Sequence, residues 1–291
     1  MIKLDYTCIT CNLNQVIRSM RLLEFPKDKQ EQILKDILAY SRDIDYSKKN
    51  NLEIITDSWE IVCNRIGRED PYREVKNHYN LEIEKMSGDI KRAIETSGDK
   101  FVSAVKMAIL GNLIDFAIES DFEWDALTRK IAGAENIQFT VDDSGKLYEG
   151  LKKAETLLYI GDNCGEIVFD KIFIEGIKKE FPGVSVSYAA RGKPIANDVT
   201  MEDALMVGMD KIARVVDNGD SALGTIMYRV SAEFKKMFDE ADIIISKGQA
   251  NFESLFDLER GGIFFLFMAK CGIIAKLLGV DPLSILCLEK K

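Results

Sequence analysis

Apolar residues recur at helical spacing through the first half of the chain, up to about Val141. This spacing predicts amphipathic helices over residues 30–40, 52–66 and 81–94, and a helix over 100–118 that is apolar on most of its faces. Pro26 and Pro71 fall between these segments, where helix boundaries are expected. We therefore predict a helical N-terminal region over residues 1–145.

The pattern changes after the turn-rich residues Asp142–Gly145, where short apolar runs begin to alternate with helical ones. We predict strands over residues 157–160, 184–190, 213–216, 242–245 and 263–268, the last being the final strand of the core. Helices are predicted over residues 166–181, 201–209, 225–238 and 271–278. This alternation is typical of an α/β protein with a parallel sheet, and we assign it to a second domain over residues 146–291.

Three polar clusters begin where three of the predicted strands end. They cover residues 161–166 (GDNCGE), 191–198 (RGKPIAND) and 246–253 (SKGQANFE). In an open parallel sheet the carboxyl ends of the strands meet at one edge, and ligands bind there. Asp, Asn and Lys side chains that converge at this edge would suit a hard metal ion and a phosphate.

Asp162 and Asn163 offer the oxygen ligands that Mg²⁺ or Mn²⁺ prefers. Gly161 and Gly165 on either side let the backbone come close to a ligand, and the N-terminus of the following helix favours an anion. The alternative is that Asp162 only caps the helix that follows the strand. This motif alone does not decide between the two.

Asp198 allows the same two interpretations, because residues 197–200 (NDVT) also fit a helix cap. Its position favours the ligand, since two strand-end carboxylates of one sheet can reach the same ion. Arg191 could neutralise a phosphate or pair with a carboxylate.

Lys247 is placed as a point charge for phosphate oxygens, with Gly248 permitting close approach of the backbone. The alternative is a solvated surface lysine. Asn251 fits a further helix cap, and residues 217–219 (DNG) fit either a pocket edge or a simple turn.

Composition narrows the classes of protein that remain. The chain has 291 residues, a net charge of −9 and a pI of about 5.0, which argues against binding to nucleic acid or an anionic membrane. No signal peptide is apparent, and the most apolar segment, residues 261–280, carries Lys270 and Lys276. We expect a cytoplasmic protein.

Cys8 and Cys11 form a C-x-x-C pair without a second pair, which is a weak zinc signal because a closed site needs four ligands. Ordinary free thiols, a regulatory pair and a partial metal site all stay open. His78 is the single histidine and is expected at the surface, so a His-based triad is disfavoured. The sequence has no dinucleotide-binding glycine motif after the first of these strands, no P-loop and no nucleophile elbow.

The strand-end clusters together resemble the domain-of-unknown-function-89 family, the metal-dependent damage-control phosphatases. The matching stretches are residues 161–170 (GDNCGEIVFD), 191–204 (RGKPIANDVTMEDA) and 246–255 (SKGQANFESL). Weaker matches are residues 111–115 (GNLID) and the C-x-x-C pair, which is similar to the stand-alone archaeal and bacterial branch.

This resemblance implies a helical N-terminal region packed on a three-layer α/β/α sandwich. It implies one divalent cation (Mn²⁺, Co²⁺, Ni²⁺ or Mg²⁺) held by Asp162, Asn163 and Asp198. Lys247 matches the family lysine that touches the phosphate, and Asn112 matches an asparagine that faces the site. The implied activity is hydrolysis of small phosphate monoesters, such as sugar phosphates or damaged phosphometabolites.

A mechanism that fits is attack by a metal-activated water while Lys247 and Arg191 hold the phosphate oxygens. Glu166 or Asp198 would orient the water, with Glu166 at the edge of the substrate site. A phosphorylated Asp162 is the competing chemistry. Two other classes stay open: an S-adenosylmethionine-dependent methyltransferase or other transferase, and a non-catalytic binder of phosphorylated metabolites. The oligomeric state is not predicted.

Overall fold

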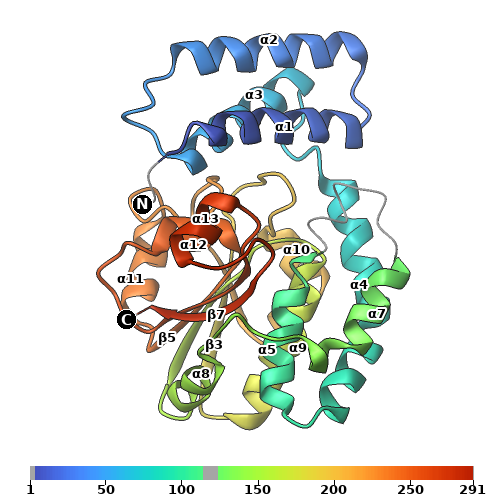
Figure 1. Ribbon diagram of the computed structural model, residues 1–291, viewed down its shortest axis with the longest axis vertical. Coiled ribbons are helices and arrows are strands. Elements are labelled where there is room, and N and C mark those ends of the chain that lie inside the picture. The colour runs from blue at the N-terminus through green and yellow to red at the C-terminus, as the bar shows by residue number, and fades with distance from the viewer. Residues whose placement is uncertain (1–3, 114–123, 291) are drawn as a thin grey trace.

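The computed structural model describes residues 4–113 and 124–290 (Figure 1). Its α-helices are α1 (Thr7–Leu22), α2 (Lys27–Asp43), α3 (Asn51–Ile66), α4 (Arg73–Thr96), α5 (Lys100–Leu110), α7 (Trp124–Ala132), α8 (Ser144–Leu151), α9 (Glu166–Glu180), α10 (Met201–Met206), α11 (Ala232–Glu240), α12 (Gln249–Leu255) and α13 (Gly272–Leu278). Two short 3₁₀ helices cover Ala134–Asn136 and Met209–Lys211.

Within the described residues, one sheet contains seven strands in the order β1-β7-β6-β5-β2-β3-β4. The strands are β1 (Val141–Asp142), β2 (Thr156–Ile160), β3 (Ser185–Ala190), β4 (Arg214–Asp217), β5 (Ile243–Lys247), β6 (Ile263–Met268) and β7 (Ile285–Lys290). Neighbouring strands are parallel except for β6 and β7, which are antiparallel.

The strand order reverses at β2, which lies between β3 and β5. From β2 the chain adds β3 and β4 on one side, and it then returns to add β5 and β6 on the other. Such a reversal opens a crevice at the carboxyl ends of the two central strands. Asp162 follows β2 and Lys247 ends β5, so both lie at this crevice.

Helices cover both faces of the sheet. Tyr159 and Ile245 contribute to the core beneath α4, α5 and α9, whereas Leu158 and Ile244 contribute to the core beneath α11, α12 and α13. This division follows from the alternation of side chains along a strand. Figure 1 shows the two helical layers on either side of the strands, which confirms the predicted α/β/α sandwich.

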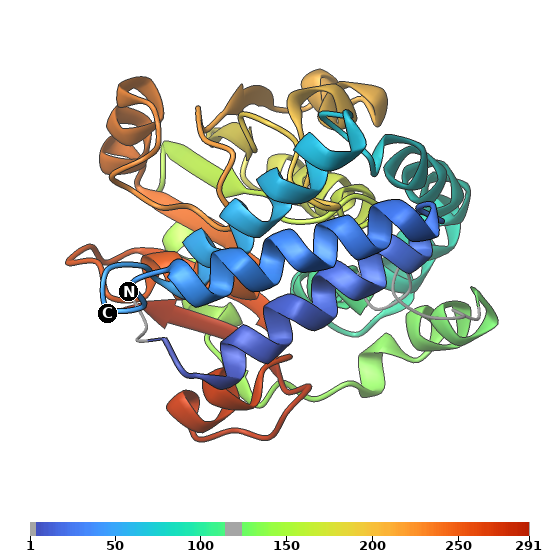
Figure 2. The same cartoon turned by 90° about the horizontal axis from the view of Figure 1, so that it is seen from above.

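Helices α1, α2 and α3 form a third core of their own and lie across one end of the sandwich (Figure 2). Ile195, from the loop after β3, is part of that core. The N–H of Leu223, from the loop after β4, donates to Thr56 Oγ1 on α3 at 3.1 Å. Since both loops follow the carboxyl ends of their strands, these three helices cover the edge at which the predicted site lies.

Several predicted boundaries differ from the structure. The segment predicted as a helix over 225–238 is irregular up to Ser231, which caps α11 by accepting the N–H of Phe234. The strand at 263–268 is not the last, because β7 follows it. Residues 114–118 of the helix predicted over 100–118 lie outside the described residues. The boundary at residue 145 stays a prediction, although β1 and helices α4 and α5, which precede it, pack into the sheet and its core.

No helix in the described part of the chain is long and apolar enough to cross a membrane.

Candidate metal and phosphate site

Asp162 and Asp198 come together because the turn after β2 pairs with the loop after β3. The N–H of Val199 donates to the Asp162 carbonyl at 2.9 Å, and an antiparallel bridge joins Asn163 to Asp198. Ala196 has a φ of 44°, a left-handed conformation that non-glycine residues rarely adopt. The loop therefore contains strained backbone two residues before it delivers Asp198 to the site.

Two asparagines donate to the Asp162 carboxylate. Nδ2 of Asn112 lies 3.1 Å from Asp162 Oδ2 and 2.9 Å from Glu166 Oε2. Nδ2 of Asn163 lies 2.8 Å from Asp162 Oδ2. Oδ1 of Asn112 is buried and has no hydrogen-bond partner among the described residues. An unpartnered buried oxygen beside two carboxylates is a position where a cation or an ordered water would be favourable.

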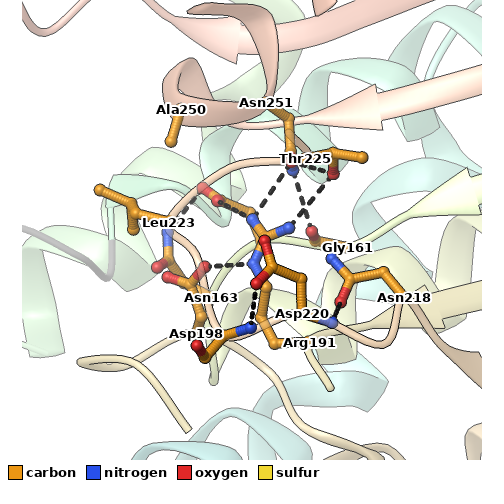
Figure 3. A network of polar contacts seen from close by, with 12 residues as sticks. Gly161, Asn163, Arg191, Asp198, Asn218, Asp220, Leu223, Thr225, Ala250 and Asn251 are labelled. Carbon is orange, nitrogen blue, oxygen red and sulfur yellow. Dashed lines mark hydrogen bonds and ion pairs between the residues drawn. The ribbon is translucent and has the colours of Figure 1, made fainter. Parts of the chain in front are cut away.

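Arg191 is the hub on the other side of the carboxylates (Figure 3). Its Nε donates to Asp198 Oδ2 at 2.7 Å. One Nη nitrogen donates to Thr225 Oγ1 at 3.3 Å, and the other donates to Asn251 Oδ1 at 3.1 Å. The second of these also lies 4.0 Å from Asp162 Oδ1. The guanidinium is thus fixed in orientation by groups from three different loops or helices.

Lys247 is fully buried, so its interpretation as a solvated surface lysine is wrong. Its Nζ donates to Glu166 Oε1 at 2.5 Å, to Asp170 Oδ1 at 2.6 Å and to the Ala108 carbonyl at 2.8 Å. Glu166 and Asp170 are one turn apart on α9, so that both face the lysine. Tyr159 Oη donates to the same oxygen of Asp170 at 2.6 Å.

Burial perturbs the ionisation of these groups. Burial, together with the charges of Asp198 and Glu166, raises the pKa of Asp162 well above its ordinary value. Burial also raises the pKa of Asp170 to about 6, against the attraction of Lys247. Burial alone would lower the pKa of Lys247, but the charges of Asp170 and Glu166 outweigh it and raise that pKa.

The buried charges in this cluster do not balance. They are four carboxylates (Asp162, Glu166, Asp170 and Asp198) and two cations (Arg191 and Lys247). With all six ionised, two negative charges are in excess, and uncompensated buried charge is strongly unfavourable. A divalent cation has the charge that is missing, and the carboxylate and amide oxygens here suit a hard ion.

The amide oxygens are needed for such a site. Within residues 4–113 and 124–290, no three His, Cys, Asp or Glu side chains form a metal-binding group by themselves. The predicted set combines two carboxylates, from Asp162 and Asp198, with the amide of Asn163.

Gly248 lets the turn after β5 approach the turn after β2. A Cβ atom at this position would lie only 1.9 Å from Asp162 Oδ2. The φ of Gly248 is 77°, in the region that favours glycine. The position therefore requires glycine both for its backbone conformation and for the space that the Asp162 carboxylate occupies.

Comparison with known proteins decides the family. A family model described as the damage-control phosphatase ARMT1-like domain matches residues 4–286. The chain belongs to this family. It is 35% identical over 291 residues to a damage-control phosphatase of Pyrococcus horikoshii, with 99% of each chain covered. It is 32% identical over 286 residues to a damage-control phosphatase of Archaeoglobus fulgidus, with 96% of each covered.

A solved structure agrees with this assignment. The crystal structure of a DUF89 family protein from Pyrococcus horikoshii matches the whole of both chains with a TM-score of 0.88 at 32% identity. The resemblance indicated by the strand-end motifs is therefore confirmed. In the weaker match at residues 111–115, Ile114 and Asp115 lie outside the described residues.

All the site residues predicted for this family member gather at the carboxyl edge of the sheet. They are Asn112, Asp162, Asn163, Glu166, Arg191, Asp198 and Lys247. The helix-cap interpretation of Asp162 is wrong, because the N-cap of α9 is Gly165. The cap expected over residues 197–200 is present, but Thr200 supplies it and Asp198 does not.

Three residues that contact this cluster were not predicted as site residues: Asp170, Thr225 and Asn251. Asn251 is not a helix cap. It lies inside α12, and its Nδ2 donates to the carbonyls of Gly161 at 3.1 Å and Lys247 at 2.7 Å. A signal for Asp170 was present in the sequence, since it is a carboxylate one turn after Glu166, with only apolar residues between the two.

The turn after β4 lies beside the loop that carries Arg191. Oδ1 of Asn218 accepts the N–H groups of Gly192 and Asp220, each at 3.0 Å. This turn therefore closes one side of the cluster (Figure 3).

The C-x-x-C pair lies at the start of α1. Cys8 is half-buried and Cys11 is exposed, and no disulfide joins the two. His78 is exposed on α4, as predicted.

Proposed function

We propose that the protein is a metal-dependent phosphatase that hydrolyses small phosphate monoesters, such as sugar phosphates or damaged phosphometabolites. The observation that carries this proposal is the set of four buried carboxyl groups against two buried cations at the switch point of the sheet, beside a fixed guanidinium. The names of the relatives from Pyrococcus horikoshii and Archaeoglobus fulgidus, both damage-control phosphatases, support the reaction type.

Asp162, Asn163 and Asp198 would hold a divalent cation, with Mn²⁺, Co²⁺, Ni²⁺ and Mg²⁺ as candidates. When bound, such a cation polarises a phosphate oxygen and lowers the pKa of a water. Asn112 acts behind this set, because its amide donates to Asp162 and Glu166 and limits how the two carboxylates can turn.

Arg191 is assigned to the phosphate. Three of its five N–H groups donate to Asp198, Thr225 and Asn251. We assign the other two to phosphate oxygens, where a pre-oriented guanidinium stabilises the charge that spreads over them in the transition state. Lys247 and the N-terminus of α9 supply the remaining positive potential.

Water is the nucleophile in this proposal, with Glu166 and Asp198 as the carboxylates that orient it. A trapped phosphoryl group on Asp162 would contradict this assignment and favour a covalent intermediate instead.

The test is phosphate release from a panel of sugar phosphates and cofactor phosphates by chelator-treated protein, with each of the four metals added back. We expect release only with metal, and a loss of at least about 1,000-fold in Asp162→Asn, since the negative charge of one ligand is removed. Asp242→Asn is the matched control. Asp242 accepts hydrogen bonds from the N–H groups of Glu155 and Thr156, each at 2.9 Å. Thr156 begins β2 and Glu155 directly precedes it, at the end of the strand opposite to the site.

Retention of activity in Asp162→Asn would refute the site assignment. No release with any metal from the unaltered chain would instead favour a binding or transferase role, and phosphate-ester binding or methyl transfer would then be measured.

A further inference from the structure

All three N–H groups of the Lys247 ammonium group already donate hydrogen bonds. A protonated lysine has three N–H donors, and here they reach Glu166, Asp170 and the Ala108 carbonyl at 2.5–2.8 Å. The side chain is fully buried. A phosphate oxygen can therefore bind Lys247 only by taking the place of one of these three acceptors.

Two of the acceptors belong to the interior. The Ala108 carbonyl is part of α5, and Asp170 is fixed by the Tyr159 hydroxyl from the middle of the sheet. Neither residue contacts Asp162, Asn163 or Asp198 through any of the hydrogen bonds described above. Displacing either one would leave a buried polar group of the core without its partner, which is costly.

Glu166 is different because it faces the site. Its Oε1 accepts from Lys247, while its Oε2 accepts from Asn112 at 2.9 Å and, more weakly, from Asn163 at 3.4 Å. Both asparagines also donate to Asp162. Glu166 therefore joins Lys247 to the groups assigned to the cation, and Oε1 can leave while Asn112 retains Oε2.

We propose that Glu166 is a placeholder for the substrate: its carboxylate occupies the position on Lys247 that a phosphate oxygen takes, and Asp170 is the positioning residue that keeps Nζ in place during the exchange. This inference rests on the proposed function. The exchange also explains how Glu166 becomes available to orient the water, because the arriving phosphate displaces the Glu166 carboxylate from Lys247.

Two matched substitutions test the exchange, because each removes one carboxylate charge from the same ammonium group. The measurement is the affinity of the Mg²⁺-loaded protein for inorganic phosphate, by titration calorimetry. Glu166→Gln should bind phosphate about tenfold more tightly, since a neutral amide competes less well for Lys247 than a carboxylate does. Asp170→Asn should bind phosphate more weakly, because Nζ loses its anchor.

An effect of charge alone would tighten phosphate binding in both variants, and that result would overturn the proposal. Unchanged or weaker binding in Glu166→Gln would overturn it as well.

Glu166→Asp provides a second test that does not depend on the folding of Asp170→Asn. It keeps the charge but withdraws the carboxylate from Lys247 by one methylene, so the proposal expects tighter phosphate binding. Affinity equal to that of the unaltered chain would contradict the exchange. Thermal unfolding of each variant identifies any that is not folded.

The two proposals fail in different ways. Metal-dependent phosphate release by the unaltered chain, with both carboxylate variants binding phosphate alike, leaves the phosphatase in place and removes the placeholder. Absence of release from the unaltered chain removes the phosphatase itself.

Discussion

Two lysines are buried among the residues that the structure describes, and they are used in different ways. Lys76 on α4 is 1% exposed and pairs with Asp70 at 2.8 Å and Asp203 at 2.9 Å. Lys247 is 0% exposed and pairs with Glu166 and Asp170 at 2.5 and 2.6 Å. In both cases one cation lies between two carboxylates, so the number of charges does not distinguish them.

The carboxylates around Lys76 also accept hydrogen bonds from other groups of the protein. Asp203 Oδ2 accepts the N–H and the hydroxyl of Thr200 in the capping box that starts α10, at 2.9 and 2.6 Å. Asp70 accepts the N–H of Tyr72 at 3.1 Å. Lys76 therefore braces the helical region against the segment that follows Asp198.

The carboxylates around Lys247 are less completely satisfied. Oδ2 of Asp170 is buried with no hydrogen-bond partner among the described residues, and Glu166 is bound by side chains of the site. The comparison indicates that a buried ion pair contributes to stability where its carboxylates also accept hydrogen bonds from backbone N–H groups. It is suited to a role in the reaction where some carboxylate oxygens have no hydrogen-bond partner and the charges do not balance.

Replacing each lysine by methionine gives the largest contrast. Each change leaves two buried carboxylates without their cation, and we expect each to lower the free energy of unfolding by about 3–5 kcal/mol. Lys247→Met should also lower kcat/KM by at least about 100-fold, because the positive charge near the phosphate is lost. Lys76→Met should keep kcat/KM within about threefold, when both are measured well below their unfolding temperatures.

The control for the Lys76 cluster is Lys76→Arg, which keeps the charge and should recover most of the stability. An equal loss of turnover in folded Lys76→Met and Lys247→Met would show that the two clusters act as one, and the contrast would fail.

Two glycines give the next contrast. Gly248 and Gly208 both have a positive φ, of 77° and 72°, but Gly208 is in the left-handed helical region with a ψ of 31°, whereas Gly248 is extended with a ψ of 161°. A Cβ on Gly248 would lie 1.9 Å from Asp162 Oδ2, whereas the nearest atom to a Cβ on Gly208 would be in the Lys211 side chain at 3.4 Å. Gly208→Ala should therefore lower stability by about 1 kcal/mol, the penalty of the left-handed conformation alone.

Gly248→Ala should carry a larger penalty, because its combination of φ and ψ is essentially restricted to glycine, and should in addition lower turnover by at least about tenfold, because Asp162 must move. Phosphate release and chemical denaturation measure the two effects separately. Equal turnover in the two alanine variants would mean that the position of Asp162 is not critical.

The carboxyl-edge cluster was predictable because strand ends in a parallel sheet share an edge, so Asp162, Asp198 and Lys247 could be expected together from the order of the elements. The contacts that surround this cluster, such as those of Asp170 and Lys76, could not be predicted in this way. Lys247 and Asp170 are 77 positions apart, and Lys76 and Asp203 are 127 positions apart. A charged residue inside a helical pattern is ordinarily assigned to the solvent face, and only the packing of α4 and α9 reverses that assignment for Lys76 and Asp170.

Strands β1 and β7 escaped prediction for a related reason. The first has only two residues, and the second, Ile285–Lys290, alternates too briefly before it reaches charged residues. Both become strands because β7 pairs with β6, which is buried along its whole length, and β1 then pairs with β7. Tertiary pairing therefore decides these two strands, and local pattern does not.

The last contrast is a pH dependence that reports the imbalance around Lys247. Because the pKa of Asp170 is raised to about 6 in the folded protein from an ordinary value of 3.8, the folded chain holds this proton more tightly than the unfolded chain does. Its contribution to the free energy of unfolding is therefore fully present below about pH 4 and is lost as the pH rises through 6. Urea unfolding of metal-free protein between pH 4 and 7 should show Asp170→Asn gaining stability relative to the unaltered chain, by up to about 3 kcal/mol.

Asp242 provides the opposite case at the far edge of the sheet. Hydrogen bonds from the Thr156 side chain and the N–H groups of Glu155 and Thr156 lower the pKa of Asp242 below its ordinary value. Its contribution is present above that value and is lost as the pH falls, so Asp242→Asn should lose stability relative to the unaltered chain as the pH rises through 4. If both variants changed in the same direction, the proton on Asp170 would not be held as its burial requires. The carboxylates around Lys247 would then be as well compensated as those around Lys76.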